Sequence, residues 1–223
     1  MRGGVEVAVV DDPATAAAEL LAAAAARGGN VALSGGATPV PAYEVASALA
    51  PDWSRVGLWF ADERAVPPND ERSNHRLVRT HLLERLVEPP ARIHRIRGEL
   101  GAAEAASVYE RELIGVRLDL VLAGIGPDGH TASLFPYAPA LTEKERLVVA
   151  APAGLEPLVD RVTLTPLAIS QARLLVFLVT GAEKAEAVRR ALAAPPDPGT
   201  PASLVRAART RALLDRAAAS RLA

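Results

Sequence analysis

Residues 118–136 of the chain read LDLVLAGIGPDGHTASLFP, and this stretch decides the fold class. Its first six residues are apolar except Asp119, a pattern typical of a strand that is buried on both faces. Three glycines follow, so the chain can turn sharply where the strand ends. Residues 174–179, LLVFLV, form a second run of this kind and lead to Gly181. Two such strands predict a sheet with helices on both of its faces.

The rest of the chain alternates between strand and helix patterns, which favours a mostly parallel sheet in an α/β fold. The expected strands are residues 5–10, 31–33, 56–60, 118–123 and 174–179, with weaker candidates at 92–97, 147–150, 162–164 and 212–214. The expected helices are residues 14–26, 40–50, 75–87, 102–115, 181–193 and 215–223. Residues 61–74 read as a polar loop, and the prolines of residues 194–202 predict a surface loop. Too little chain follows this second loop to form a core, so we expect residues 1–223 to form a single domain.

The composition excludes several classes of site and partner. The 223 residues include no cysteine, which rules out disulfides, thiolate metal sites and a cysteine nucleophile. The net charge is −1, and no clustered basic excess indicates nucleic acid or a membrane surface as a partner. The longest apolar run near the N-terminus, residues 20–26, is too short to span a bilayer, and no signal-peptide pattern precedes it. We therefore expect a cytoplasmic protein.

Four loops with polar or glycine-rich sequences directly follow expected strands. They are residues 34–39, 61–74, 124–136 and 181–184. Ligands of open α/β sheets bind at the carboxyl ends of the strands, so these loops are expected to form one site.

The first of these loops, SGGATP at residues 34–39, has the features of a phosphate cradle. Gly35 and Gly36 let backbone N–H groups approach an anion, and the hydroxyls of Ser34 and Thr38 add donors at the start of a helix. The alternative is a tight turn in which Thr38 caps the helix and Pro39 opens it. The sequence alone leaves both interpretations open.

Charged residues follow the strand at residues 56–60 directly. Asp62 and Glu63 are expected to stand at its carboxyl end, and the Arg64 guanidinium is suited to a phosphate or carboxylate. The alternative is a solvated turn with a local ion pair. Lys184 lies in the first turn of an expected helix, where its charge opposes the helix dipole. A bound anion would explain it, and so would pairing with a neighbouring glutamate.

The loop at residues 124–136 opens with GxG but does not match a dinucleotide-binding fingerprint. Asp128 would repel a pyrophosphate, and no acidic residue closes a second strand about 20 residues later. The glycines instead predict a turn that presents Asp128 and His130 as an acid–base pair, because histidine is suited to act as a base near neutral pH. His75, His81 and His94 lie in helix or strand patterns without such an aspartate in a glycine turn, and they are expected to be structural.

Four separated motifs together resemble the 6-phosphogluconolactonase family over most of the chain. They are LSGGATP, WFADERAVPPNDERSN, GIGPDGHTASLFP and RVTLTPLAISQARLLVFLVTGAEKAEAV, in the family's order. The resemblance implies a Rossmann-like three-layer α/β sandwich. It also implies hydrolysis of 6-phosphoglucono-δ-lactone to 6-phosphogluconate in the pentose phosphate pathway, without a metal or other cofactor. The alternative is the related glucosamine-6-phosphate deaminase/isomerase, whose blocks run closer to DEY and DGHIAFNEP; the forms DER and DGHTASLFP here favour the lactonase.

These motifs assign a role to each candidate site residue. His130 is predicted to act as general base on a water molecule, with Asp128 orienting its imidazole. The predicted substrate-binding residues are Ser34, Gly35, Gly36, Thr38, Asp62, Arg64, Arg161 and Lys184. Arg161 is included because it opens the RVTLT block. The expected partner is the small sugar-phosphate lactone alone, and the expected assembly is a monomer or weak homodimer.

Overall fold

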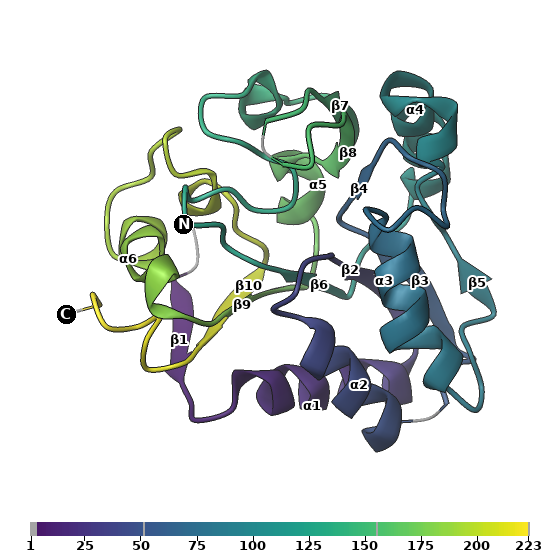
Figure 1. The fold of residues 1–223 in the computed structure, drawn as a ribbon, viewed down its shortest axis with the longest axis horizontal. Coiled ribbons are helices and arrows are strands. Elements are labelled where there is room, and N and C mark those ends of the chain that lie inside the picture. Colours follow the sequence, from purple (N-terminus) through teal and green to yellow (C-terminus); the bar gives the residue numbers. More distant parts are fainter. Residues whose placement is uncertain (1–3, 51, 155, 223) are drawn as a thin grey trace.

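A computed structural model describes residues 4–50, 52–154 and 156–222, and its centre is a sheet of seven strands that all run parallel. The spatial order is β1-β10-β9-β6-β2-β3-β5 (Figure 1). The strands are β1 (Val5–Val9), β2 (Gly29–Leu33), β3 (Val56–Phe60), β5 (Arg92–Ile93), β6 (Leu120–Ala123), β9 (Leu174–Val179) and β10 (Arg209–Leu214). The predicted parallel sheet is therefore confirmed.

Helices cover both faces of this sheet. They are α1 (Pro13–Arg27), α2 (Val40–Leu49), α3 (Asn74–His81), α4 (Ala102–Leu113), α5 (Pro166–Ser170) and α6 (Ala185–Leu192). Figure 1 shows α1 and α2 side by side along one face, while α4 and α5 lie on the other side. This arrangement is the expected three-layer sandwich.

Helix α1 shows how local sequence produces an element of this fold. The Asp12 carboxylate accepts a hydrogen bond from the Thr15 N–H at 3.0 Å, and Pro13 occupies the first helical position. Gly28 ends the helix with a φ of 75°, which a glycine adopts without strain. Ala17 and Leu21 on its inner face are buried against the sheet. The small alanines let the helix pack closely on the strands.

A second, antiparallel sheet was not predicted. Its strands, in spatial order, are β4 (Asp62–Arg64), β8 (Arg161–Leu164) and β7 (Val148–Ala151). Residues 62–64 were expected in a loop, but their backbone pairs with β8, so that Asp62 lies opposite Thr163 and Arg64 opposite Arg161. This pairing fixes the backbone of the charged segment that follows β3.

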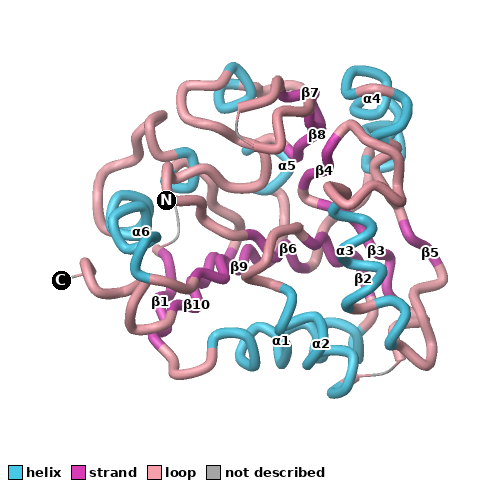
Figure 2. The backbone as a smooth tube through the Cα atoms, viewed as in Figure 1, coloured by secondary structure: helices cyan, strands magenta, loops and turns pink. Residues whose placement is uncertain are grey.

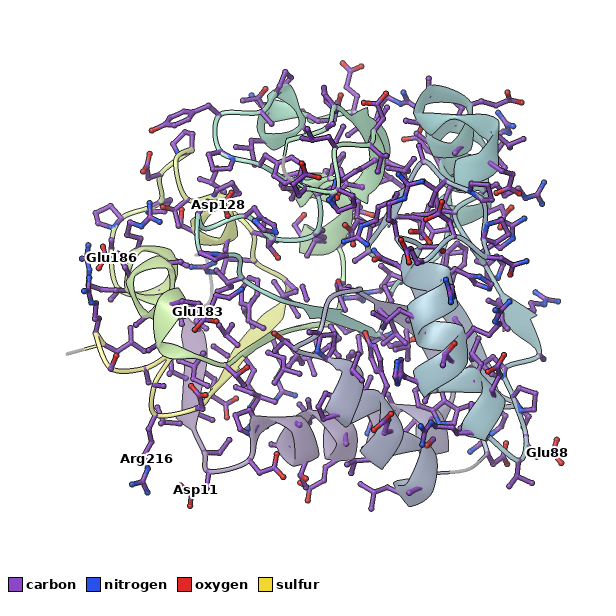
Figure 3. The ribbon with its side chains drawn as sticks, viewed as in Figure 1. Asp11, Glu88, Asp128, Glu183, Glu186 and Arg216 are labelled. Carbon is purple, nitrogen blue, oxygen red and sulfur yellow. The ribbon has the colours of Figure 1, made fainter. Side chains whose placement is uncertain are left out.

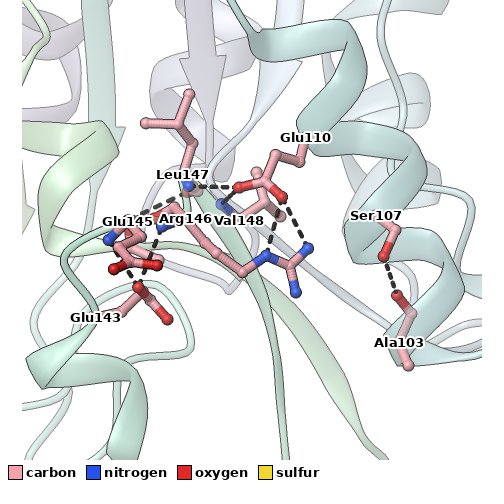
Figure 4. A network of polar contacts seen from close by, with 9 residues as sticks. Ala103, Ser107, Glu110, Glu143, Glu145, Arg146, Leu147 and Val148 are labelled. Atoms are coloured by element: carbon pink, nitrogen blue, oxygen red, sulfur yellow. Dashed lines mark hydrogen bonds and ion pairs between the residues drawn. The ribbon is translucent and has the colours of Figure 1, made fainter.

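The carboxylate of Glu110 ties α4 to this small sheet (Figure 4). It accepts a hydrogen bond from the Leu147 N–H at 2.6 Å and one from the Arg146 Nε at 2.9 Å. The carboxylate of Glu143 accepts from three successive backbone N–H groups just before β7. These bonds fix the approach to β7, which itself pairs with β8.

Two predicted helices differ from the structure. The helix expected at residues 75–87 ends at His81, because Leu82 has a φ of −128° that interrupts it; a 3₁₀ turn at Leu83–Arg85 follows. The helix expected at residues 215–223 is wrong over the described residues 215–222, which form turns. The Asp215 carboxylate there accepts from the N–H groups of Gly181 and Ala218. Backbone hydrogen bonds from Ser220 to Ala217 and from Leu222 to Ala219 span three residues, which closes turns and does not continue an α-helix.

The strand order reverses between β2 and β6. From β2 the chain continues outward to β3 on one side, and β6, β9 and β10 lie on the other. Loops that leave two such neighbouring strands diverge and create a crevice, which is where ligands of open α/β sheets bind. The loops are the pink segments of Figure 2, and much of the chain above the sheet belongs to them. In the part of the chain that is described, no helix combines the length and the apolar character needed to cross a membrane.

Candidate active site

A cavity of about 370 Å³ lies where β2, β3, β6 and β9 end. Its lining includes these predicted site residues: Ser34, Gly35, Gly36, Thr38, Asp62, Arg64, His130, Arg161 and Lys184. Asp128 does not line the cavity but contacts the His130 imidazole. In Figure 3, Asp128 and Glu183 mark the side of the molecule on which the loops after β6 and β9 lie. The four loops thus meet in space, as their positions after the strands predicted.

Asp128 and His130 form a direct pair. The Asp128 Oδ1 lies 2.5 Å from the His130 Nδ1 and also accepts a hydrogen bond from the His130 N–H at 3.1 Å. Burial raises the pKa of Asp128, but the hydrogen bonds and charge of His130 outweigh it, so the pKa lies below its ordinary value. An ionised carboxylate at Nδ1 requires a proton there, which leaves the lone pair of the neutral ring on Nε2.

The glycines of this loop make the pair possible. The Gly126 N–H donates to the His130 carbonyl at 2.8 Å, and the Gly129 N–H donates to the Gly126 carbonyl at 2.9 Å. A Cβ at position 126 would lie 2.1 Å from the His130 Cε1, so only glycine fits beneath the ring. Tight turns, and no helix, follow β6 in residues 124–136, so the dinucleotide fingerprint, which needs a helix there, is absent.

The loop at residues 34–39 presents polar groups to the cavity. The buried Ser34 Oγ has no hydrogen-bond partner among the described residues. Gly36 has a φ of 92°, a conformation that favours glycine. The alternative interpretation as a capped turn is wrong in detail. Pro39 rather than Thr38 is the N-cap residue of α2, and no side chain there makes a capping hydrogen bond.

Arg64 and Arg161 lie directly opposite each other in the antiparallel pair β4–β8. Burial lowers the pKa of Arg161, and the neighbouring Arg64 charge lowers it further, although an arginine stays protonated. The Arg64 Nη1 donates to the Arg72 carbonyl at 2.5 Å, and no ion pair joins Arg64 to a carboxylate within the described ranges. Like charges opposite each other on paired strands are destabilising. An anion in the cavity would neutralise this repulsion.

Asp62 is buried and held by two side chains that sequence analysis did not single out. Its Oδ2 accepts a hydrogen bond from the Ser133 Oγ at 2.6 Å, and its Oδ1 accepts one from the Asn74 Nδ2 at 3.1 Å. Asn74 also lines the cavity, where a Cβ at Gly35 would lie 1.9 Å from its Oδ1. Asn74 ends the charged loop and Ser133 follows His130 by three residues, but neither position alone indicates the contact.

Lys184 points to the loop at residues 124–136 rather than to a glutamate. Its Nζ donates to the Ile125 carbonyl at 3.3 Å. In the described part of the chain it forms no ion pair with Glu183 or Glu186, and Glu186 pairs with Arg189 at 2.8 Å. The explanation by local pairing is therefore wrong, and the lysine charge faces the cavity.

Glu63 is buried beside the site but acts on the backbone of α3. Its carboxylate accepts from the Asn74 N–H at 2.7 Å, the His75 N–H at 2.8 Å and the Ser73 Oγ at 3.0 Å. Burial raises the pKa of Glu63, and these hydrogen bonds oppose that rise. Glu63 thereby fixes the helix terminus that presents Asn74.

Within residues 4–50, 52–154 and 156–222, no group of three His, Asp or Glu side chains lies close enough together to hold a metal ion.

Comparison with known proteins finds a matching family model and similar curated proteins. The family model described as "Glucosamine-6-phosphate isomerases/6-phosphogluconolactonase" matches residues 6–214. The 6-phosphogluconolactonase of Homo sapiens is 40% identical over 186 residues, which cover 78% of this chain and 72% of the human protein. The 6-phosphogluconolactonase of Synechocystis is 39% identical over 180 residues, which cover 76% of this chain and 74% of that protein.

Solved structures share the fold. The 6-phosphogluconolactonase of Thermotoga maritima superposes with a TM-score of 0.84 at 29% identity, covering 95% of this chain and 99% of that one. The Leishmania guyanensis enzyme of the same name gives 0.87 at 27% identity, covering 99% and 100% of the two chains. A monomeric glucosamine-6-phosphate deaminase also gives 0.84, covering 97% and 100%, but at 22% identity it shows the fold alone. With four motifs, one cavity and these relatives in agreement, the chain belongs to the glucosamine-6-phosphate isomerase/6-phosphogluconolactonase family.

Proposed function

We propose that the protein hydrolyses 6-phosphoglucono-δ-lactone to 6-phosphogluconate, the second step of the oxidative pentose phosphate pathway. One observation carries this proposal: the His130 imidazole, oriented by Asp128, lines the same cavity as a glycine loop and three cationic side chains. A base and an anion cradle in one cavity are what the hydrolysis of a phosphorylated lactone requires. The relatives named 6-phosphogluconolactonase support the same choice.

The proposed chemistry is general-base hydrolysis. The His130 Nε2 takes a proton from a water molecule, and the water oxygen attacks the lactone carbonyl. Asp128 holds the ring through Nδ1 and stabilises its charged form. The imidazolium then returns the proton to the ring oxygen as the ester bond breaks. A positioned base of this kind contributes about 10²–10⁴-fold to the rate.

The phosphate of the substrate occupies the other half of the cavity. The N–H groups and hydroxyls of Ser34–Thr38 surround it, and Arg64, Arg161 and Lys184 neutralise its charge. The unpartnered Ser34 Oγ supports this placement, because a buried hydroxyl without a partner is costly unless a ligand supplies one. Asp62 faces the sugar hydroxyls while Ser133 and Asn74 hold its carboxylate.

Two substrates separate this function from that of the deaminase relatives. Freshly prepared 6-phosphoglucono-δ-lactone and glucosamine-6-phosphate are given separately to the purified protein. We expect lactone loss well above its spontaneous rate and no release of ammonia from the amino sugar. Ammonia release without faster lactone loss would overturn the proposal.

A His130→Gln variant tests the general base separately. We expect kcat for the lactone to fall about 10²–10⁴-fold, the contribution of a positioned base. His94→Gln is the matched control, because His94 stacks on Trp59 with ring centroids 3.8 Å apart and does not line the cavity. Near-normal turnover by His130→Gln would remove this role while leaving the substrate assignment intact.

We further propose that residues 1–223 form a single domain. The protein acts in the cytoplasm as a monomer or weak homodimer, and its partner is this small molecule and not nucleic acid. The described apolar core supports the first point, because it forms one cluster that includes both Ala17 and Ala218. Light scattering across a concentration series measures the assembly directly.

A further inference from the structure

The turn at residues 197–203, between α6 and β10, was predicted as part of a surface loop but is held by several internal hydrogen bonds. The Thr200 N–H donates to the Asp197 carbonyl at 2.8 Å, and the Gly199 N–H donates to the Asp197 Oδ1 at 3.1 Å. The Ser203 Oγ accepts from the Asp197 N–H at 2.8 Å, which closes the turn. Thr200 and Ala202 are buried. The segment is therefore a preformed unit rather than a loose connection.

This turn contacts the loop at residues 124–136 at Gly129; we call that loop the catalytic loop because it carries Asp128 and His130. The Ala202 N–H donates to the Gly129 carbonyl at 3.0 Å. Gly129 has a φ of 93°, and a Cβ there would lie 2.8 Å from the Thr200 Cγ2 and 3.1 Å from its Cα. Figure 1 shows the yellow-green chain after α6 running beside the teal loop that follows β6. Gly129 thus lies directly against Thr200.

A second contact holds the far end of the same loop. The Tyr137 N–H donates to the Pro198 carbonyl at 3.1 Å. Tyr137 has a φ of 59°, which is unusual for a residue other than glycine. A Cβ at Gly199 would lie 2.6 Å from the Tyr137 hydroxyl. The 197–203 turn therefore contacts the chain on both sides of residues 130–136, at Gly129 and at Tyr137.

We propose that Thr200 is a positioning residue for the hydrolysis, acting through Gly129 on the two residues that flank it, Asp128 and His130. The inference rests on the proposed function of His130 as general base. The side chains of Asp128 and His130 are partly exposed. The turn that carries them is restrained where Gly129 packs against Thr200. The glycine loop at Ser34–Thr38 is separate from this turn, and Arg64 and Arg161 lie on the β4–β8 pair, so a loosened turn displaces the base with little effect on phosphate binding. A small displacement of a catalytic group is enough to reduce the rate strongly.

Three variants of Thr200 test the proposal. Thr200→Gly removes the side-chain part of the contact with Gly129, and Thr200→Ser removes only the methyl group. Thr200→Val is the matched control: it keeps a methyl in place and replaces the Thr200 Oγ1, a buried hydroxyl without a hydrogen-bond partner among the described residues. All are assayed well below their unfolding temperatures. We expect kcat to fall about tenfold or more in Thr200→Gly and less in Thr200→Ser, with KM within about twofold, and Thr200→Val to match the parent protein.

A second measurement does not depend on substrate. Hydrogen exchange of the amides in residues 126–130 is expected to accelerate at least tenfold in Thr200→Gly, or in Thr200→Ser if the glycine variant does not fold, and to stay unchanged in Thr200→Val. Unchanged exchange and kcat in the smaller variants would overturn the proposal, as would an equal loss in Thr200→Val. A parent protein without lactonase activity would instead refute the proposed function, while the exchange result would still report on Thr200.

Discussion

The Asp128 carboxylate determines which nitrogen of His130 can act as a base. Its 2.5 Å contact with Nδ1 leaves Nε2 for the substrate side, and its charge favours the imidazolium that forms when water is deprotonated. An amide at this position keeps the size of the side chain but loses that charge. In the proposed mechanism Asp128 acts only through His130, so its removal should be milder than removal of the base itself.

We predict that Asp128→Asn lowers kcat about tenfold to a hundredfold, less than His130→Gln, because the base remains but its charged form loses a partner. The pKa of Asp128 is lowered on folding, so its contribution to stability is present above its ordinary value of 3.8 and lost as the pH falls through the lower folded value. Urea unfolding should thus show the parent's advantage over Asp128→Asn at pH 7 and a smaller one near pH 3. An advantage that grew on acidification would contradict the assignment.

The opposed pair Arg64 and Arg161 gives a prediction of a different kind. Removing one guanidinium from a phosphate site weakens binding, and a hydrogen bond to a charged group contributes about 1.5–3 kcal/mol. We expect Arg161→Gln to raise KM for the lactone about 10- to 100-fold with little change in kcat, because Arg161 is not among the reacting groups. Steady-state kinetics decide the matter: a loss confined to kcat would place Arg161 at the carbonyl rather than at the phosphate.

At the scale of elements, two carboxylates fix helices to strands in the same manner but at different distances from the cavity. Glu63 holds the first N–H groups of α3 to the middle of β4, and Glu110 holds α4 to the start of β7. Only the first of these connections leads to the site, since α3 begins with Asn74, which contacts Asp62. Comparing variants of Glu63 and Glu110 therefore distinguishes an effect on stability alone from an effect on the site.

We predict that Glu63→Gln and Glu110→Gln both lower the free energy of unfolding, because each puts an amide N–H₂ where backbone donors need an acceptor. Only Glu63→Gln should also raise KM, since a displaced Asn74 disturbs Asp62 and Gly35. The measurements are denaturant unfolding and kinetics on the same preparations. Equal effects of the two variants on KM would show that the α3 terminus has no special influence on the site.

Elements were predictable from sequence where burial imposed a pattern. The apolar runs of β6 and β9 identified the central strands, and the chain from Pro13 to Arg27 carried its own cap and stop. Strand β4 was not predictable, because Asp62–Arg64 has no apolar alternation and pairs with a distant part of the chain. The same holds for Asn74 and Ser133, whose contacts with Asp62 depend on how loops meet in space.

At the scale of the whole molecule, the site depends on the order of the strands. Because β6 lies beside β2, the loop carrying His130 faces the glycine loop at residues 34–39 across the point where the strand order reverses. The alternation of strands and helices predicted that the loops would share one edge of the sheet. It could not predict which loops are neighbours, because that follows from long-range pairing. The antiparallel pair β4–β8 adds Arg64 and Arg161 to the lining of the cavity.

A ligand that joins these loops should stabilise the entire fold rather than one part of it. We predict a single cooperative unfolding transition, as expected of one domain built on one core, and an upward shift of that transition with 6-phosphogluconate. At a hundred times its Kd a ligand adds about 2.7 kcal/mol, which for a chain of this length corresponds to about 5–10 °C in Tm. Scanning calorimetry measures both quantities. Arg161→Gln provides the control, since it should unfold as cooperatively as the parent but respond less to the same concentration of product. Two separated transitions, only one of them shifted, would refute the single-domain proposal and assign the site to one part of the chain.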